Sequence, residues 1–545
     1  MRIEEFRVQH YRSIEEVTLT FPKNKPLILF GPNNAGKSNL LSALNIFLGE
    51  KYPTYTDMKD NDFFMRNPQE YPETILTASF DATYYYSYKS NEGITTVELH
   101  LNKGEAKDAK YFCDTSGNKL YIRQEDRRQC QSFMIDAVRN LFSEFNYSSS
   151  YSLLSKFSRR VHDSLGDESR NKLSLIFREI KEVFGGSKEF KQFFDVFQNS
   201  VKHSVSGFVH SLDVDFSAYD PTNYAKSMRI YAKEQDQIRS FGEFGTGEQQ
   251  ILLMAFVKAY METFGGESFV LIIEEPEAHL HPLAQKWLKE YIDELCQAGI
   301  QVVISTHSSD FLDFRNLDGL VRVYKDGGIT SASQIFPRDL CQFCIETGVD
   351  AQLVTEENIC EYFSTRLTSE QLRGLFADVV LLVEGQTELY ALPVLFKRIG
   401  FYLPKEGIEI VGSGGKNNIP LLWRIYKAYG YMTYLLFDAD CDSKVNDNLF
   451  SKVIKQCKSD KNYKEDWVLD PSQFTSRMVF AYFGKDFENY LRENLDEYEE
   501  LQKVAKEEHL IKSKPGIAKY IASNSCEIPD FIFELKNDLE LLKLL

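Results

Sequence analysis

The chain has 545 residues, of which 43% are hydrophobic and 26% are charged, a composition typical of globular proteins. This length predicts about three to four domains. The net charge of −17 argues against a surface coated for nonspecific nucleic-acid binding, although it leaves room for a local basic groove. No apolar run approaches the roughly 18 residues that span a bilayer, and the N-terminus lacks the pattern of a signal peptide. We therefore expect a cytoplasmic protein with no membrane partner.

The nine cysteines are scattered along the chain, and only Cys341 and Cys344 form a C-x-x-C pair. A structural zinc site of that type needs a second pair of ligands at a suitable spacing, and none follows nearby. We interpret these two residues as ordinary reduced thiols.

The first 205 residues predict a β-rich region followed by a helical one. Residues 3–21 alternate between apolar and polar, which predicts the two strands of a hairpin. The apolar run at 26–30 is typical of a buried parallel strand, and the helical pattern at 39–48 follows it after a glycine-bearing loop. Residues 75–123 are β-rich. Residues 125–205 turn polar and helix-like without a strand pattern, which predicts a helical insertion.

The rest of the chain alternates between helices and short apolar strands. A helix is predicted at 247–262, and buried strands are predicted at 269–275 and 301–306, with a helix beginning near Pro282 between them. A mainly helical linker follows, and at 377–383 a new series of strands, loops and helices begins.

A phosphate-binding loop lies at residues 31–38, where GPNNAGKS fits the pattern G-x-x-x-x-G-K-[ST]. The glycines let backbone N–H groups wrap the phosphates, Lys37 reaches the β- and γ-phosphates, and Ser38 offers a hydroxyl to Mg²⁺. The loop lies between a predicted strand and a predicted helix, as this motif requires. The motif predicts a site for ATP with Mg²⁺. Its expected nucleotide contacts are Gly31, Asn33, Asn34, Gly36, Lys37, Ser38 and Asn39.

Two further motifs place polar residues at the ends of predicted strands. In VLIIEEPEAHLHP (270–282), Glu274 is expected to hold Mg²⁺ through water, and Glu275 is expected to position the attacking water. In QVVISTHSS (301–309), His307 follows the strand, where it is able to contact the γ-phosphate.

The segment FGTGEQQ (244–250) resembles the signature motif of ABC-type ATPases, with Gly245, Gly247 and Glu248 as the expected nucleotide contacts. The Ser-Gly-Gly core that is common in that family is replaced here by Gly245-Thr246-Gly247, so we expect the contact with the γ-phosphate to differ. In that family the motif of one subunit closes over ATP held by another, which implies a homodimer or a higher oligomer.

Arg12, in the segment HYRSI, lies where such ATPases often contact nucleotide. Asp57, Asp60 and Asp62 lie near the expected Q-loop, and the sequence favours none of them.

A second group of acidic residues follows two strands in the C-terminal third. Glu384 is predicted at the end of one strand, with Glu388 a turn along the next helix. Asp438, Asp440 and Asp442 follow another strand at alternate positions, which predicts that they share one side. Clustered carboxylates repel one another unless cations neutralise them, so we expect one or two Mg²⁺ or Mn²⁺ ions here.

These acids resemble the Glu-Gly-x-x-Glu and Asp-x-Asp motifs of the Toprim domain. Between them, the turn IVGSGGKNN could line the site with Gly412, Ser413 and Lys416. In the OLD (overcoming lysogenization defect) family, a late Glu and a late Lys complete this site. The resemblance assigns these roles to Glu488 as a metal ligand and to Lys514 as a cation that stabilises the leaving phosphate.

The order of motifs resembles the OLD family over nearly the whole chain. The resemblance implies an α/β protein, with an ABC/SMC-like ATPase domain, a helical insertion that commonly mediates dimerisation, and an α/β Toprim domain with a parallel sheet. The implied parts are the ATPase at 1–124 and 206–335, the insertion at 125–205, the linker at 336–375 and the Toprim nuclease domain at 376–545.

The family resemblance also implies a function. Members are metal-dependent DNA endonucleases or nickases, in which the ATPase regulates and the Toprim domain cuts by two-metal chemistry. Glu275, His307, Glu384, Asp438 and Lys514 are the expected catalytic residues. Many members are anti-phage effectors, and the implied partners besides DNA are a reverse transcriptase with its retron DNA or, in Gabija-type systems, a helicase.

Three other classes remain as alternatives. A Toprim topoisomerase needs a nucleophilic tyrosine on a DNA-gate domain, and 30 tyrosines leave that open by count. A primase usually brings a zinc module, for which there is no sequence pattern. A noncatalytic RecF/SMC-like DNA clamp would need the Toprim acids to be structural, and the long heptads of SMC arms are absent between the phosphate-binding loop and the signature.

Overall fold

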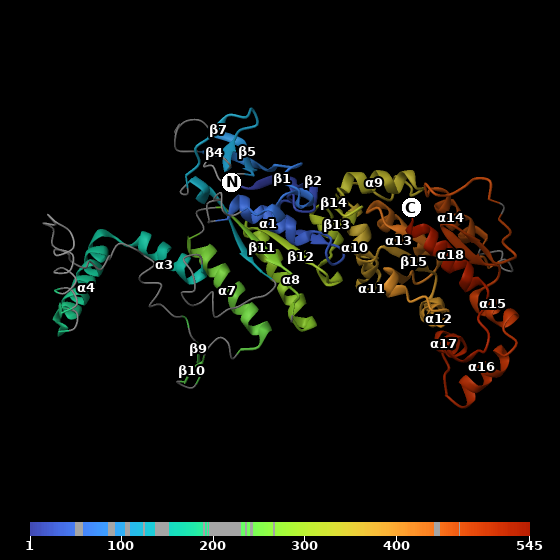
Figure 1. The fold of residues 1–545 in the computed structure, drawn as a ribbon. Helices are drawn as coiled ribbons and strands as arrows, with labels where there is room; N and C mark the ends of the chain where they lie inside the picture. Colours follow the sequence, from blue (N-terminus) through green and yellow to red (C-terminus); the bar gives the residue numbers. More distant parts are fainter. Residues whose placement is uncertain are drawn as a thin grey trace. The chain divides into compact units, whose positions relative to one another are not determined.

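The computed structural model divides into two compact units (Figure 1). The first comprises Met1–Ala137, Ser268–Ala278 and Pro282–Leu545, and the second comprises Val138–Glu267 and His279–His281. The structure describes residues 1–49, 58–85, 93–103, 110–123, 126–136, 152–188, 191–192, 195, 230, 232–234, 237–239, 244–264, 268–278, 280–440, 447–467 and 469–544.

A twelve-stranded sheet, here called the large sheet, forms the first half of the first unit. Its strand order is β7-β6-β5-β4-β1-β2-β14-β13-β3-β12-β11-β8. The strands are β1 (Ile3–Tyr11), β2 (Ile14–Thr20), β3 (Leu27–Phe30), β4 (Glu73–Tyr85), β5 (Gly93–Asn102), β6 (Lys110–Cys113), β7 (Lys119–Leu120), β8 (Cys130–Ile135), β11 (Ser268–Glu274), β12 (Gln301–Thr306), β13 (Leu320–Asp326) and β14 (Ile329–Gln334).

The large sheet is parallel on one side and antiparallel on the other. Strands β13, β3, β12, β11 and β8 pair in parallel, whereas β1, β2, β4, β5, β6 and β7 form antiparallel pairs. Every residue of β3 and of β12 is buried, as expected for central parallel strands whose two faces are covered. The predicted hairpin at 3–21 and the predicted buried strands are confirmed.

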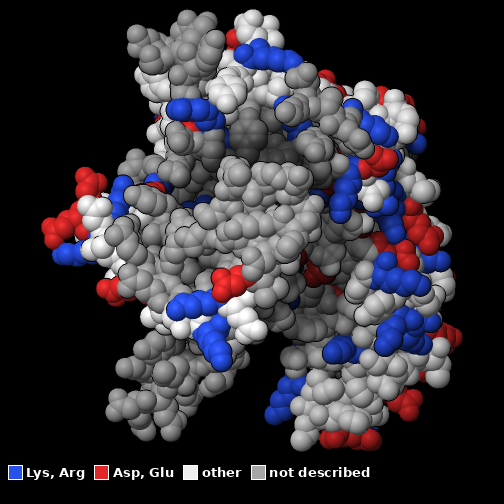
Figure 2. Space-filling model, turned by 60° about the vertical axis from the view of Figure 1, so that its left-hand side comes forward, with Lys and Arg blue, Asp and Glu red and all other residues white. Residues whose placement is uncertain are grey.

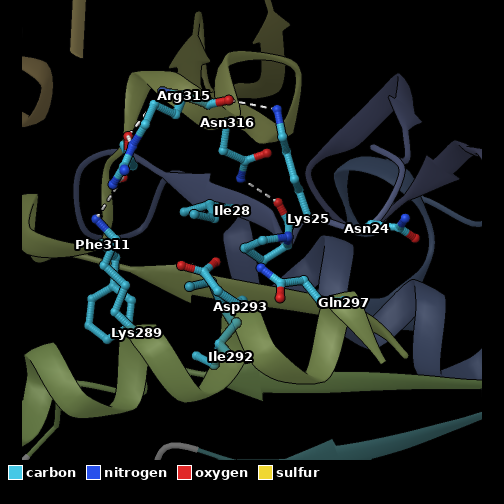
Figure 3. Close-up of a pocket in the computed structure, with 13 residues that line it drawn as sticks. Asn24, Lys25, Ile28, Lys289, Ile292, Asp293, Gln297, Phe311, Arg315 and Asn316 are labelled. Atoms are coloured by element: carbon cyan, nitrogen blue, oxygen red, sulfur yellow. Dashed lines mark hydrogen bonds and ion pairs between the residues drawn. The ribbon is translucent and has the colours of Figure 1, made fainter. Parts of the chain in front are cut away.

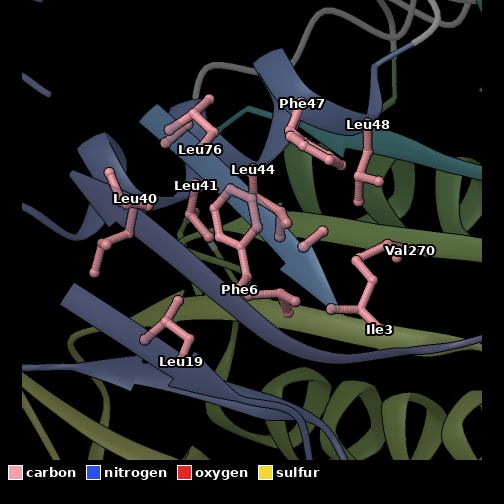
Figure 4. Packing of buried hydrophobic residues seen from close by; sticks show 14 of the residues in the cluster. Ile3, Phe6, Leu19, Leu40, Leu41, Leu44, Phe47, Leu48, Leu76 and Val270 are labelled. Atoms are coloured by element: carbon pink, nitrogen blue, oxygen red, sulfur yellow. The ribbon is translucent and has the colours of Figure 1, made fainter. Parts of the chain in front are cut away.

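Helix α1 (Lys37–Leu48) supplies the core over the large sheet. Its apolar side packs on residues of β1, β2, β4 and β11, as Figure 4 shows for Leu40, Leu44 and Phe47 around Phe6. Phe6 and Phe47 meet edge to face, with ring centroids 5.8 Å apart. Each such fully buried side chain contributes about 1.5–3 kcal/mol relative to an exposed one. This packing fixes the end of α1 that carries the phosphate-binding loop.

One expectation for this region is wrong. The range 125–205 was expected to contain helices without strands, but β8 lies inside it and pairs in parallel with β11. Cys130, Ser132 and Ile135 of the sequence CQSFMI are buried, and β11 is the partner that stabilises this segment as an edge strand of the large sheet.

Helix α8 (Pro282–Gln297) joins β11 to β12, with proline at its first position as predicted. A helical segment then leads out of the large sheet, as expected for the linker: α9 (Pro337–Glu346), α10 (Ile359–Ser364) and α11 (Ser369–Leu372). Cys341 and Cys344 are both buried on α9. Short 3-10 helices occur at Asp60–Asp62, Phe64–Arg66, Asp126–Gln129, Ser309–Phe311, Phe314–Gly319, Arg373–Phe376, Leu403–Glu406 and Lys416–Asn418.

A five-stranded sheet, here called the C-terminal sheet, completes the first unit. Its order is β16-β15-β17-β19-β18, and its parallel character is confirmed for all strands except β18, which pairs antiparallel at one edge. Its strands are β15 (Val379–Val383), β16 (Ile408–Gly412), β17 (Met432–Asp438), β18 (Thr475–Arg477) and β19 (Phe480–Phe483). Its helices are α12 (Gln386–Arg398), α13 (Ile419–Ala428), α14 (Asp447–Lys458), α15 (Phe487–Asn494), α16 (Tyr498–Glu507), α17 (Lys514–Asn524) and α18 (Phe531–Lys543).

The second unit contains α3 (Leu153–Ser164), α4 (Asp167–Gly186), the short hairpin β9 (Ala232–Glu234) and β10 (Gln237–Arg239), and α7 (Thr246–Phe264). The Ser152 hydroxyl caps α3 by accepting a hydrogen bond from the Ser155 N–H. The helix predicted at 247–262 is confirmed as α7. Among the helices in the described part of the chain, none is long and apolar enough to cross a membrane.

Candidate functional site

The loop between β3 and α1 has the backbone of a phosphate cradle. Gly31 and Gly36 have φ values of +143° and +111°, which L-residues with side chains rarely adopt. A Cβ at Gly31 would lie 2.0 Å from the Val323 carbonyl oxygen. At Gly36, a Cβ would lie 2.2 Å from the Thr330 hydroxyl. Both conformation and space therefore require glycine at these two positions.

Lys37 is buried at the base of this loop, where its Nζ donates hydrogen bonds to the carbonyls of Gly31 and Pro32 at 3.0 and 2.9 Å. Burial lowers the pKa of Lys37 to about 8, against the opposing influence of nearby carboxylates. A phosphate anion would compensate this desolvated ammonium better than neutral carbonyls do. Asn33 and Asn34 are exposed in the same loop, and Asn34 has a left-handed backbone with φ +63°.

Ser38 and Glu274 lie in direct contact, the hydroxyl donating a hydrogen bond to the carboxylate. The contact joins residues 236 positions apart, because β3 and β11 are both neighbours of β12. A hydroxyl and a carboxylate at this point are the oxygen ligands that Mg²⁺ prefers. The structure therefore brings together the two residues that the sequence assigned to the metal of the nucleotide.

Glu275 and His307 also meet, with 3.5 Å between the His307 Nε2 and the Glu275 Oε1. Glu275 has φ +44°, a left-handed conformation that costs a non-glycine residue about 1–3 kcal/mol. Burial and the positive charge of Lys37 lower the pKa of His307, which favours the neutral imidazole. The expected water-positioning carboxylate and the expected γ-phosphate contact thus lie side by side.

Arg12 lies in the turn between β1 and β2, and its side chain contacts helix α1. Its Nε donates to the Asp62 carboxylate at 3.0 Å, and its guanidinium donates to the Asn39 amide oxygen at 3.2 Å. Among the three aspartates near the expected Q-loop, Asp62 is thus the partner of Arg12. Asp60 is largely exposed and pairs with Lys103, and Asp57 lies outside the described residues.

Glu277 is a residue of this site that the sequence reasoning missed. Its Oε1 accepts hydrogen bonds from the Thr306 hydroxyl at 2.8 Å and from the His307 N–H at 2.6 Å. Burial raises the pKa of Glu277. The residue ties the segment after β11 to the start of the segment that carries His307. Its only sequence signal was its place as the third acid in EEPE, which has no diagnostic spacing.

The signature-like segment belongs to the second unit. The Gly245 N–H donates to the Glu248 carboxylate at 3.1 Å, which closes the first turn of α7. A Cβ on Gly247 would lie 3.3 Å from Leu280. The expected nucleotide contacts of Gly245, Gly247 and Glu248 stay predictions.

The second site lies at the carboxyl ends of β15 and β17, which are neighbours in the C-terminal sheet. Glu384 follows β15, and its carboxylate accepts a hydrogen bond from the Asp438 N–H at 3.2 Å. Glu388, only 4% exposed, is in the first turn of α12, and its carboxylate accepts a hydrogen bond from the Gly385 N–H at 3.1 Å. Parallel pairing thus brings together acids that are about 50 residues apart in the chain.

Burial and mutual repulsion disfavour the ionised forms of these acids. Burial, followed by the charges of Glu388 and Glu384, raises the pKa of Asp438 well above its usual range. Burial chiefly raises the pKa of Glu388 to about 7. Among the described residues, the Asp438 Oδ1 is buried and accepts no hydrogen bond. An orphaned carboxylate oxygen among three acids fits a divalent cation, which would satisfy the oxygen and neutralise the group.

Asp440 departs from the predicted alternation along one strand. Strand β17 ends at Asp438, and Asp440 lies beyond it with φ +50°, held by the hydrogen bond from its N–H to the Lys485 carbonyl. Its carboxylate nevertheless turns towards the site, where it binds the Lys416 ammonium. Asp442 lies outside the described residues.

Lys416 is the cation that contacts the acids. It is buried, and besides Asp440 it lies 3.7 Å from the Glu384 Oε2. The glycine turn after β16 carries it there, as the sequence suggested. We call Glu384, Glu388, Asp438, Asp440, Glu488 and Lys416 the carboxylate cluster.

Glu488 and Lys514, which the family resemblance assigned to this site, lie in different places. The Glu488 carboxylate accepts a hydrogen bond from the Thr387 hydroxyl at 3.1 Å, beside Glu388, so the structure brings it to the cluster. Lys514 is the exposed first residue of α17, and in the described part of the chain no hydrogen bond or ion pair joins it to the carboxylates. The side chain opposite the acids is that of Lys416, because the turn after β16 is next to the ends of β15 and β17.

A separate cavity of about 240 Å³ lies between the start of β3 and α8 (Figure 3). Two of its polar side chains donate to backbone carbonyls of the lining: Lys25 donates to the Arg315 carbonyl, and Asn316 donates to the Pro26 carbonyl. Asp313 pairs with Arg315 and Lys289. We interpret this cavity as a structural feature of the fold and not as a binding site.

Two family models match the chain. The model described as AAA ATPase domain matches residues 1–127 and 116–312, and the model described as overcoming lysogenization defect protein-like, TOPRIM domain matches residues 375–440. An OLD nuclease of Thermus scotoductus is 24% identical over 459 residues, which cover 80% of this chain and 82% of that protein. The Old nuclease of Escherichia phage P2 is 24% identical over 475 residues, which cover 81% of this chain and 77% of that protein.

Among solved structures, the SMC head domain from Thermotoga maritima is 14% identical and covers 62% of this chain and 99% of that chain. With a TM-score of 0.31, this likeness carries no argument about function.

Proposed function

Because the chain belongs to the AAA ATPase domain family and, through its OLD-like TOPRIM domain, to the OLD nucleases, we propose that it is a metal-dependent DNA endonuclease or nickase whose cleavage is regulated by ATP. The observation that carries the proposal is the carboxylate cluster, in which buried acids with raised pKa values surround an orphaned carboxylate oxygen. A site of this composition is arranged for cations. ATP with Mg²⁺ would occupy the loop at residues 31–38.

The acids of the carboxylate cluster and Lys416 would have different roles in cleavage. Glu384, Glu388, Asp438 and Glu488 would hold one or two Mg²⁺ or Mn²⁺ ions, which supply an activated water and stabilise the leaving oxygen. We assign to Lys416, rather than Lys514, the neutralisation of charge beside the scissile phosphate, because its ammonium is already buried among the acids.

Cleavage of supercoiled plasmid tests the nuclease. Wild-type protein is incubated with Mg²⁺ or Mn²⁺, with and without ATP, beside Glu384→Ala and Asp438→Ala. We expect nicked or linear plasmid from the wild type and neither product from the two variants. Glu465→Ala, which changes an exposed acid of the same domain, should cut like the wild type. The arms with and without ATP decide whether the nucleotide activates or restrains cutting.

Two outcomes would contradict the nuclease. Relaxed closed circles would indicate a topoisomerase, and unchanged plasmid with retained DNA binding would indicate a noncatalytic clamp. On the described part of the face in Figure 2, Lys and Arg are interspersed with Asp and Glu, so DNA contact on this face would be local.

Calorimetry tests the ATP site separately. Lys37→Ala removes the buried ammonium and should abolish ATP binding, while Mn²⁺ binding at the carboxylate cluster stays as in the wild type. Unchanged ATP binding in this variant would contradict the assignment of the loop at 31–38.

We also propose a homodimer or higher oligomer. A signature motif acts on nucleotide held by a partner subunit, and α4 of the second unit exposes Leu175, Ile176 and Val183 by more than half. Light scattering should show a dimer for the wild type and a monomer for Ile176→Glu. A dimer for both the wild type and Ile176→Glu would contradict a role of α4 in dimerisation.

The biological setting that we propose is cytoplasmic anti-phage defence. It rests on the family resemblance, with a reverse transcriptase and its retron DNA or a helicase as the partner. A gene for either protein beside the gene of this chain would support that setting. Phage challenge of cells with the wild type or Glu384→Ala tests it directly, and equal plaque counts would contradict it.

A further inference from the structure

A group of polar side chains lies on the large sheet, among residues that neither the nucleotide site nor the carboxylate cluster uses. Glu98 and His100 are two positions apart on β5, so they lie on one face of the strand. Cys113 on β6 is the register partner of Glu98. The apolar residues Val97 and Leu99 of β5 are buried in the core on the opposite face. The pairing of β5 with β6 therefore gathers a carboxylate, an imidazole and a thiol.

The ligand atoms of these three residues lie within 4.8 Å of one another. The His100 Nε2 lies 3.2 Å from the Glu98 Oε2, and the Cys113 Sγ lies 3.6 Å from the same oxygen. Zinc bonds of about 2.0 Å to nitrogen, about 2.1 Å to oxygen and about 2.3 Å to sulfur, at tetrahedral angles, separate the ligands by about 3.4 Å for N···O and about 3.6 Å for S···O. The observed separations are close to those values.

The outer contact of the imidazole fits the same interpretation. The His100 Nδ1 lies 2.7 Å from the Glu73 Oε1, a residue of the neighbouring strand β4. If Nδ1 carries the proton and donates it to Glu73, the lone pair of Nε2 is directed to the side of Glu98 and Cys113. A carboxylate that orients a histidine in this way is the usual outer partner of a metal-bound imidazole. The ring is held further by stacking on Tyr111, with centroids 4.9 Å apart.

We propose that Glu98, His100 and Cys113 form a zinc site on the large sheet, with Glu73 orienting His100 and a water molecule in the fourth position. A thiolate and an imidazole favour zinc over magnesium or calcium. The ligand charges also balance: zinc binding releases the Cys113 thiol proton to solvent, and thiolate and Glu98 carboxylate together neutralise the ion. Without a cation, burial and then the charge of Glu98 raise the pKa of Cys113 to about 12.

The alternative is a metal-free ion pair, in which a protonated His100 bridges Glu73 and Glu98 and the Cys113 thiol donates to Glu98. Both arrangements satisfy the same contacts. They differ in one observable, because only a metal site contains a bond between the metal and the Cys113 sulfur.

Cobalt substitution of the full-length protein makes that bond visible. Chelator-treated protein is titrated with Co²⁺, and the thiolate-to-cobalt charge-transfer absorption is recorded. We expect the absorption to saturate at about one equivalent per chain and to disappear when Zn²⁺ is added, because zinc prefers a tetrahedral site with thiolate and imidazole ligands and displaces the cobalt. Glu384→Ala should keep the absorption, which separates this site from the carboxylate cluster. Cys344→Ser, which alters another buried thiol, should also keep it.

The ligand variants decide the proposal. Cys113→Ser should lose the charge-transfer absorption, and Glu73→Gln should weaken cobalt affinity by about 10- to 100-fold. His100→Gln should weaken affinity at least as much, and it tests the site at a partly exposed residue if Cys113→Ser fails to fold. An absorption that is absent from the wild type, or that persists in folded Cys113→Ser, would overturn the zinc site in favour of the ion pair.

Discussion

Lys37 has no carboxylate within hydrogen-bonding distance in the described structure, although its ammonium is buried. Two carbonyl oxygens hold it, and burial lowers its pKa to about 8. The residue is therefore charged near neutral pH and loses its charge in mildly alkaline solution. The two carbonyls and the nearby carboxylates offset part of the cost of keeping this ammonium desolvated, and a bound phosphate would offset more of it.

This pKa predicts how ATP binding depends on pH. Below about pH 8 Lys37 is protonated and attracts the phosphates, and above it the ammonium is lost. Measured by calorimetry in EDTA, which removes the metal, the Kd for ATP should rise by up to about tenfold per pH unit above pH 8. Lys37→Met should bind weakly, with a Kd that lacks this rise. A wild-type Kd that is constant from pH 7 to 9.5 would contradict the prediction.

Glu277 is the second residue whose removal has a definite expected effect. Glu277→Ala leaves the Thr306 hydroxyl and the His307 N–H without their acceptor, which should lower the free energy of unfolding by about 1–3 kcal/mol. Denaturant titration measures it. ATP hydrolysis should also fall while ATP binding is kept, because His307 is no longer held beside Glu275. Glu290→Ala, at an exposed position of α8, should change stability by less than about 0.5 kcal/mol.

At the scale of elements, the start of α1 depends on a close approach between chain segments. Gly36 caps the helix with a left-handed backbone, and the Thr330 side chain of β14 fills the space where a Cβ would lie. Thr330 is itself held, because its hydroxyl donates to the Ala35 carbonyl at 2.9 Å. The phosphate-binding loop is thus shaped by β14 as well as by its own sequence.

Two alanine substitutions separate the cost of a positive φ from the cost of a steric clash at the new Cβ. Gly36→Ala and Gly299→Ala both place a side chain at positive φ, +111° and +93°, but only Gly36 has an atom within 4 Å of the new Cβ. Gly299→Ala should cost about 1 kcal/mol in unfolding free energy, and Gly36→Ala should cost clearly more and also weaken ATP binding. Equal losses in the two variants would show that the contact with Thr330 is unimportant.

At the scale of the whole molecule, the large sheet and the C-terminal sheet share buried contacts within the first unit. Arg322 of β13 is buried and donates to the Tyr429 carbonyl at 2.6 Å, and its guanidinium lies 3.6 Å from the centroid of the Tyr431 ring. Phe30 of β3 packs edge to face on Tyr429, with centroids 5.5 Å apart. The strand that leads into the phosphate-binding loop therefore touches the segment that leads into β17.

Arg322→Ala tests this connection. It removes a hydrogen bond from a charged donor and a desolvated cation–π contact, together worth about 2–5 kcal/mol. Calorimetry should show one unfolding transition for the first unit of the wild type and two separated transitions for the same unit of the variant. Arg315→Ala, which removes an exposed arginine paired locally with Asp313, should keep one transition. One unchanged transition in Arg322→Ala would contradict the role of Arg322 in coupling the two sheets.

Most of the elements, and the motifs at their ends, follow from the amino-acid sequence alone. Buried strands such as β3, β12 and β15 are continuous apolar runs, and the loop at 31–38 has a local pattern that defines its chemistry. Glu384 and Asp438 were recognisable because each follows an apolar run, in motifs that resemble those of the Toprim domain. These features depend on neighbours along the chain, so periodicity and spacing suffice to predict them.

Which side chains meet depends on the tertiary structure. It brought Lys416 into contact with the acids. It also revealed Glu277 beside His307, placed β8 in the large sheet, and gathered Glu98, His100 and Cys113 through the register of β5 and β6. Strand order and register join residues from distant parts of the chain, and no local pattern encodes them. Asp440 shows the same limit, because the strand ends before it and a left-handed turn, not alternation, directs its carboxylate.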